Sequence, residues 1–198
     1  MASTSSPARI TELDAVNIML ANIGEAPVNS LGPTSKPTAQ RAVQRLAEES
    51  IQLQSKAYNF SAERKLTLEP DAVTGRIALP STILSWSATY TSVSLNLTED
   101  NGELYNTGDS TFIFTAPVYV EAVLARPFTS LAQPVRWYIT CSAAIAFANT
   151  EQPGGAYLRV TSEIMNEAKR AFETYDRRLL KGGLRVHNPH FRRLRGNR

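Results

Sequence analysis

The sequence predicts an α+β protein in which a bundle of about four helices carries a small inserted antiparallel β-sheet and ends in an extended C-terminal tail. Apolar residues recur at three- and four-residue spacing over residues 11–65 and 129–181, and the period changes to two over residues 66–128. A diglycine then separates the last helix from a basic arm at residues 182–198. With a flexible N-terminus at residues 1–10, these segments give the expected domain organisation.

The first helix is expected to begin at Thr11, whose hydroxyl can cap it. Glu12 and Asp14 follow in the first turn, where the helix dipole favours acidic side chains. The apolar positions are Leu13, Val16, Leu20 and Ile23. Gly24 supplies the stop, and the proline-rich residues 25–37 indicate a loop or linker.

A second helix is expected over residues 38–58. Its narrow apolar seam suits packing against other helices. The seam consists of Ala39, Val43, Leu46, Ser50, Leu53 and Ala57.

Residues 66–128 have the alternation of β-strands, and the Asn101-Gly102 pair is typical of a hairpin turn. Pro117 is expected at a sheet edge or a bulge, because proline cannot donate to the ladder. We expect about four strands, near residues 77–79 or 86–90, 93–97, 111–114 and 119–125.

Two further helices complete the expected bundle. Pro134 is well placed in the first turn of one, and residues 153–155 end it. Its apolar side consists of Val135, Tyr138, Ile139, Ala143, Ala146 and Phe147. The last helix is expected over residues 156–181, about 39 Å long at 1.5 Å per residue. Its apolar stripe consists of Tyr157, Val160, Ile164, Ala168, Phe172, Tyr175 and Leu179.

The charge is distributed unevenly along the 198 residues. Eight of the 21 Lys and Arg residues lie in residues 177–198, which contain no Asp or Glu, so residues 1–176 carry 13 basic and 18 acidic groups. A mildly acidic body with a basic appendage is typical of an interaction tail. The first ten residues do not resemble a signal peptide, and no run of about 18 apolar residues predicts a membrane span.

The residues indicate no enzyme, no cofactor and no metal site. Cys141, the only cysteine, could be paired with His187 and His190 as nucleophile and base, but it lies in a predicted apolar helix, where a thiol usually packs as a small hydrophobe. The carboxylates of Glu99, Asp100, Glu103 and Asp109 surround a hairpin tip, but their spacing fits no calcium loop and favours a solvated turn. Phosphate-binding and zinc-protease motifs are missing.

Trp86, Tyr90, Phe112 and Phe114 in the expected sheet could form a base-stacking platform. A core or a subunit interface is the favoured interpretation, because residues 84–117 contain no Lys or Arg to accompany stacked nucleotides.

The basic arm leaves alternatives open. Its cations could bind nucleic acid in a salt-dependent way, or it could be a disordered tail without a specific partner. However, a purely electrostatic arm needs no apolar residues, and this one has Leu184, Val186, Phe191 and Leu194 between its charges, with Pro189 in the middle. Such alternation suits an extended segment along a partner protein's groove, with the arginines pairing to carboxylates or carbonyls.

The order of parts resembles the tail tubular protein A, or head-to-tail adaptor, family of short-tailed bacteriophages. Four stretches carry the resemblance: AVNIMLANIGEAPVNSL (15–31), IQLQSKAYNFSAE (51–63), LEPDAVTGRIALPSTIL (68–84) and ARPFTSLAQPVRWYITCSAAIAFA (125–148). The resemblance covers about residues 11–180, in the same order as in the family. The chain departs from the family at Ala57-Tyr58, where the family often has Gly-Trp, and in the charges of residues 101–109.

The resemblance implies a structural virion protein that forms a ring, typically of twelve copies, between the portal and the tail nozzle. The ring would extend the channel through which DNA passes at genome ejection, without sequence-specific binding and without a membrane partner. Assembly would take place in the host cytoplasm, and the C-terminal arm would reach the portal. The expected portal-binding residues are Leu184, Arg185, Val186, His187, Phe191, Arg192, Arg193 and Arg195.

Overall fold

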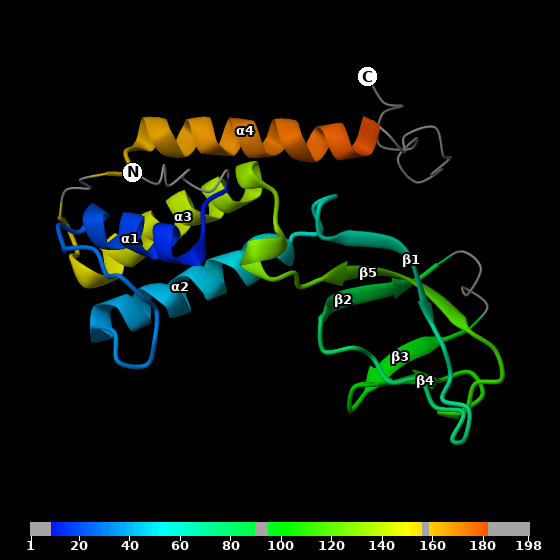
Figure 1. Ribbon diagram of the computed structural model, residues 1–198. Helices are drawn as coiled ribbons and strands as arrows, with labels where there is room; N and C mark the ends of the chain where they lie inside the picture. The colour runs from blue at the N-terminus through cyan, green and yellow to red at the C-terminus, as the bar shows by residue number, and fades with distance from the viewer. Residues whose placement is uncertain (1–8, 90–94, 156–158, 182–198) are drawn as a thin grey trace, which may run out of the picture.

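The computed structural model describes residues 9–89, 95–155 and 159–181, with helices at one end and strands at the other (Figure 1). In these residues the helices are α1 (Glu12–Asn22), α2 (Pro37–Gln54), α3 (Gln133–Glu151) and α4 (Ser162–Lys181). The strands are β1 (Ala62–Leu68), β2 (Ile83–Ala88), β3 (Leu97–Asp100), β4 (Glu103–Asn106) and β5 (Val118–Leu124). The predicted α+β class, helices with a small antiparallel sheet, is confirmed.

The start of α1 at the Thr11 cap is confirmed. Thr11 Oγ1 accepts a hydrogen bond from the Asp14 amide at 3.1 Å, and the Asp14 carboxylate accepts one from the Thr11 amide at 2.9 Å. This reciprocal pair satisfies two backbone donors that the helix leaves free. Gly24, with a φ of 78°, lies just beyond the end of α1, as the sequence predicts.

The second helix ends four residues before its predicted end at residue 58. Pro37 occupies the first turn of α2, and Gln54 is its last residue. Ala57 has a φ of 55°, which is left-handed and incompatible with a continuing helix. Ala57 lies beyond the helix and is exposed, so the prediction that it belongs to the apolar seam is wrong. Of the other seam residues, Ala39, Leu46, Ser50 and Leu53 are buried as expected.

The third helix, α3, has Pro134 in its first turn as predicted. The fourth begins at Ser162 instead of residue 156, so α4 has 20 residues and is about 30 Å long. The cause is a buried side chain of α1. Asn22 Oδ1 accepts hydrogen bonds from the amides of Arg159 and Val160 at 3.0 and 2.8 Å, so these amides are bound outside any helix. Tyr157 lies outside the described residues.

The strands form two antiparallel units. In the larger unit the order is β1-β5-β2, so the last strand in sequence lies at the centre. In the smaller, β3 pairs with β4 across the Asn101-Gly102 turn, whose φ angles of 52° and 78° are those of a type I′ hairpin. This predicted turn is confirmed.

Several strand predictions need correction. Residues 111–114 form no strand, apart from a single bridge between Thr111 and Asn106, and the predicted strands include neither β1 nor β4. The predicted strand at 93–97 coincides with the structure only at Leu97, the first residue of β3, and its first two residues lie outside the described range. Pro117 directly precedes the central strand β5, so it is at a strand start and not at an edge or bulge.

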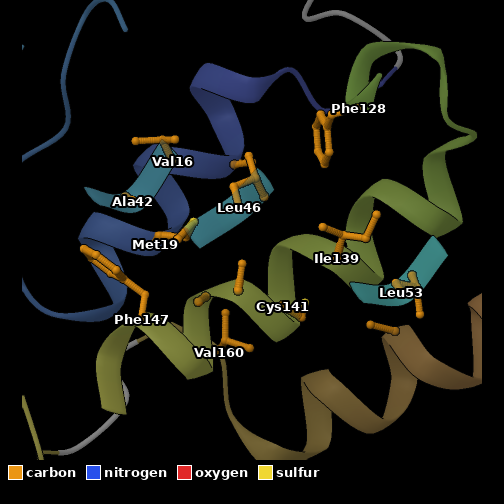
Figure 2. Packing of buried hydrophobic residues seen from close by; sticks show 14 of the residues in the cluster. Val16, Met19, Ala42, Leu46, Leu53, Phe128, Ile139, Cys141, Phe147 and Val160 are labelled. Carbon is orange, nitrogen blue, oxygen red and sulfur yellow. The ribbon is translucent and has the colours of Figure 1, made fainter. Parts of the chain in front are cut away.

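The buried apolar residues form two clusters, one among the helices and one among the strands. In the helical cluster, Val16 and Met19 of α1, Leu46 of α2 and Phe147 of α3 face one another (Figure 2). The strand cluster gathers around Leu104, Val118 and Val120. The helices thus have a core of their own, against which α4 packs through α3.

Candidate functional site

The expected portal-binding residues all lie outside the part of the chain that the structure describes. These portal-binding residues are Leu184, Arg185, Val186, His187, Phe191, Arg192, Arg193 and Arg195. His190 lies outside the described part as well. The last described residue is Lys181, which ends α4. The structure therefore defines the base from which the arm begins, the last turns of α4.

A buried carboxylate fixes the last turns of α4. One oxygen of Asp176 accepts a hydrogen bond from Asn59 Nδ2 at 2.7 Å, and the other accepts one from the Phe60 amide at 3.1 Å. Asn59 and Phe60 belong to the connection between α2 and β1. A buried carboxylate needs such donors to offset the loss of water. The base of the arm is therefore held where the strands begin.

An aromatic cluster reinforces the same position. The Phe172 ring of α4 stacks on Tyr138 of α3, with the ring centres 5.0 Å apart, and meets Tyr58 edge to face at 4.8 Å. Phe60 adds a second edge contact at 5.8 Å. Such pairs each contribute about 0.5–1.5 kcal/mol beyond the burial of their area. Phe172 thus joins α3, α4 and the α2–β1 connection.

Two chain segments that lie side by side connect the strand region to the helices, one before β1 and one after β5. Gln54, buried at the end of α2, accepts a hydrogen bond from the Arg126 amide at 2.7 Å and donates to the Arg126 carbonyl at 3.1 Å. The Leu124 amide donates to the Ser61 carbonyl at 2.9 Å. The chain therefore enters and leaves the strand region at one place.

Arg136 is a buried residue that the sequence did not single out. Its guanidinium donates to the carbonyls of Leu131 at 2.8 Å and Ile10 at 2.7 Å, and also to that of Thr129. Burial lowers the pKa of Arg136 from its usual value. The guanidinium joins the residues before α1 to those before α3, which is a structural role. An arginine between apolar helix positions was the available signal.

An open hollow of about 450 Å³ lies along one side of α4, next to the start of α3. Its residues are Pro134, Glu167, Arg170, Ala171, Thr174, Tyr175 and Arg178. Small side chains at Ala171 and Thr174 leave space between the arginines at positions 170 and 178. Among the described residues, neither arginine takes part in an ion pair.

A second exposed feature, after the hollow on α4, is a pair of loops in the strand region. We call it the sheet tip and define it as residues 69–76 and 107–117. It lies remote from the helices (Figure 1). The amide of Phe114 donates to the Gly75 carbonyl at 2.8 Å, which joins the two loops. Each loop exposes an apolar side chain, Val73 at 92% and Ile113 at 61%.

The groups considered for catalysis are separated or already bonded. Cys141 is fully buried in the helical core (Figure 2), and burial raises the pKa of its thiol to about 12. Three of the four hairpin carboxylates have different partners. Glu103 pairs with Arg76 at 2.6 Å, Glu99 accepts a hydrogen bond from Trp86 Nε1 at 3.2 Å, and Asp109 accepts one from Asn106 at 2.8 Å.

Among the described residues, Trp86, Phe112 and Phe114 do not form one platform. Phe114 is buried in the strand cluster and Trp86 packs against that cluster, whereas Phe112 contacts Tyr105 with ring centres 4.7 Å apart. Arg76 lies over the Phe112 ring at 5.0 Å. Tyr90 lies outside the described residues.

The described ranges contain neither a metal-binding cluster nor a helix that could span a membrane. No three or more His, Cys, Asp or Glu side chains come together there in an arrangement that could hold a metal ion. None of the helices there is long and apolar enough to cross a bilayer.

Comparison with known proteins agrees with the resemblance noted in the sequence. None of the curated proteins compared with the chain matches it. The family model described as tail tubular protein matches residues 13–181, which include the five strands and the four helices given above, except for the first residue of α1. The chain belongs to the tail tubular protein family, whose members are structural components of bacteriophage tails.

Proposed function

We propose that this tail protein is the head-to-tail adaptor, a ring of twelve copies that lies between the portal and the tail nozzle and continues the DNA channel. The ring is assembled in the host cytoplasm and carries no catalytic activity. Its helical scaffold lies within residues 11–65 and 129–181. Its inserted sheet extends to residue 128 and begins at Ala62 with β1, a few residues before the expected boundary at residue 66, and residues 182–198 are its arm. Membership of the tail tubular protein family supports this role.

The observation that carries the proposal is the fixed end of α4. Asp176 and Phe172 hold the last turns of this helix against two other parts of the chain, five and nine residues before Lys181. A helix fixed so close to its end delivers the following segment from a defined point. An arm that must reach one site on a partner benefits, because less freedom is lost on binding.

In the proposed contact the arm lies extended between portal subunits. Leu184, Val186 and Phe191 provide apolar anchors, and Arg185, Arg192, Arg193 and Arg195 provide directional hydrogen bonds to carboxylates or carbonyls, with His187 beside them. The acidic balance of residues 1–176 fits a channel through which DNA must slide, because a cationic lining would hold phosphates.

The test is binding of the full chain and of a chain lacking residues 182–198 to purified portal. We expect both to fold, with helix content unchanged to residue 181, and only the full chain to bind. A matched pair of variants separates the two kinds of contact. One replaces Leu184, Val186 and Phe191 by Ser, and the other replaces Arg192, Arg193 and Arg195 by Gln. Full affinity of the truncated chain would show that the arm is not the anchor.

Nucleic-acid binding by the arm is the second candidate, favoured by the eight cations of residues 177–198. It predicts a DNA mobility shift that weakens steeply with salt and is lost with the arm. The serine variant, which keeps every charge, distinguishes the two candidates. If the arm binds nucleic acid, this variant still shifts DNA. If the arm anchors the protein to the portal, this variant no longer binds the portal.

A further inference from the structure

We infer that the sheet tip of one copy docks into the α4 hollow of a neighbouring copy, with Val73 as the inserted side chain. The inference rests on the proposed function in that it names the contact by which copies join into a ring. It requires a projecting apolar group, a receptor of complementary shape and charge, and a geometry that forbids the contact within one chain.

The projecting group is Val73, held by a network of hydrogen bonds. Asp71 Oδ1 accepts from the amides of Val73 and Thr74 at 3.1 and 2.7 Å and from the Thr74 hydroxyl at 2.8 Å. The Gly75 amide donates to the Asp71 carbonyl at 2.8 Å. Hydrogen bonds from Thr74 and Val73 hold the pKa of the Asp71 carboxyl below its usual value. The loop is therefore preorganised, yet its apolar side chain is the most exposed of the large hydrophobic residues described.

The sheet tip is also acidic. Residues 69–76 and 107–117 contain three acidic residues and one basic residue, Arg76, which is paired with Glu103. Glu69, Asp71 and Asp109 are exposed residues of the tip, and none of them takes part in an ion pair among the described residues. A partner for this surface should offer cations around an apolar centre.

The α4 hollow has these properties. Ala171, Thr174 and Pro134 form a floor of small side chains, and Arg170 and Arg178 stand beside it without a partner in the described part of the chain. Its volume of about 450 Å³ is ample for a valine side chain and the turn that carries it. Glu167 lies at one end of the hollow, three residues before Arg170 in the sequence. The other end of the hollow, at Arg178, is therefore positively charged.

The partner that fills the hollow is a second copy of this chain. Each copy carries both the sheet tip and the α4 hollow, and the two cannot touch each other within one copy. The tip lies at the far end of the strands, and α4 covers the opposite side of the helices (Figure 1). A contact between two different surfaces of identical subunits is heterologous, the kind of contact that forms a ring when the rotation between neighbouring copies closes. The unpaired arginines and carboxylates then neutralise one another in every interface.

The test is disulfide trapping of the full chain, alone at high concentration and with purified portal. Wild-type protein is the control, since Cys141 is buried and its pKa is about 12. Val73→Cys and Ala171→Cys are made singly and together. We expect the mixture of the two single variants to give dimers only, and the double variant to give a ladder of higher multimers. Neither single variant alone should form the ladder.

Charge reversal provides an independent measurement if the cysteine variants fold poorly. Arg170→Glu should weaken self-association roughly tenfold, and Glu69→Arg in the same chain should restore much of it. Absence of crosslinks both alone and on the portal, with no effect of Arg170→Glu, would overturn the inference. Portal binding that persists in that case would leave the adaptor role standing. Crosslinked multimers that fail to bind portal would support the contact and contradict the adaptor role.

Discussion

The carboxylate of Asp176 in α4 and the side-chain amide of Asn59, 117 residues earlier in the chain, are joined by a 2.7 Å hydrogen bond. The same carboxylate binds the amide of Phe60, so one side chain connects the end of the last helix to the start of the strands. Asp176 and Phe60 are buried and Asn59 is half-buried, so removal of the carboxylate leaves the Phe60 amide without an acceptor. This relationship leads directly to a measurable effect on stability.

Asp176→Ala should lower the free energy of unfolding by about 2–3 kcal/mol, because the buried Phe60 amide loses its acceptor and Asn59 Nδ2 keeps only its longer bond, at 3.4 Å, to the Asp176 carbonyl. For a chain of this size that corresponds to a fall in Tm of about 4–12 °C. Glu167→Ala, on the exposed face of the same helix, is the matched control and should change stability by less than about 0.5 kcal/mol. Equal effects of the two variants would contradict the role given to Asp176.

Phe172→Ala should be more costly, about 3–5 kcal/mol, because it removes the ring on which Tyr138, Tyr58 and Phe60 all pack. Urea unfolding followed by circular dichroism measures the change. Leu179→Ala serves as the control, since Leu179 is an exposed apolar residue of the same helix. A loss below about 1 kcal/mol for Phe172→Ala would show that the cluster adds little.

Ala57→Gly should stabilise the protein by a few tenths to about 1 kcal/mol. Ala57 has a φ of 55°, and a left-handed backbone costs a residue with a Cβ about 1–2 kcal/mol, part of which is offset by the greater freedom of glycine in the unfolded chain. The same substitution at Ala47, exposed within α2, should instead destabilise by about 1 kcal/mol. Changes of the same sign at both positions would refute this explanation.

The thiol of Cys141 should resist maleimide at pH 8 in the folded protein and react once the protein is unfolded. Its pKa is about 12 when folded against an ordinary value of 9.0, so only the unfolded state loses the proton between those pH values. Stability from this group is therefore complete below about pH 9 and falls by about 1.4 kcal/mol per unit above it. Cys141→Ala should remove that part of the alkaline loss, as shown by urea midpoints at pH 8 and pH 10.5. An unchanged pH dependence would argue against the burial of the thiol.

The features predicted correctly from the sequence depend on neighbours a few residues away. The Thr11 cap is made by Asp14, three positions along, and the Asn101-Gly102 turn needs only two residues in left-handed geometry. Local chemistry of this kind is visible in a single sequence.

The errors depend on distant partners. The start of α4 was placed six residues too early because Asn22 of α1 holds the amides of Arg159 and Val160. Strand β1 has three consecutive charged residues, Glu63 to Lys65, and its strand form depends on pairing with β5, more than fifty residues later. No local pattern contains that information.

The candidate surfaces also differ in whether local sequence or the folded chain reveals them. The basic arm was found from composition alone, and its portal-binding residues remain a prediction. The α4 hollow depends on small residues at the helical spacing of Ala171 and Thr174 beside Pro134 of another helix, and the exposure of Val73 depends on a loop geometry set by Asp71. Only the folded chain brings these groups together.

The hydrogen bond between the Leu124 amide and the Ser61 carbonyl has a consequence for how such proteins diversify. Because the strand region leaves the helices where it entered them, its length and loops can change between viruses without stretching the helical scaffold. A chain in which a short turn replaces residues 62–124 should keep the helical fold. Exchange of this region between relatives offers a way to adapt one scaffold to different tails.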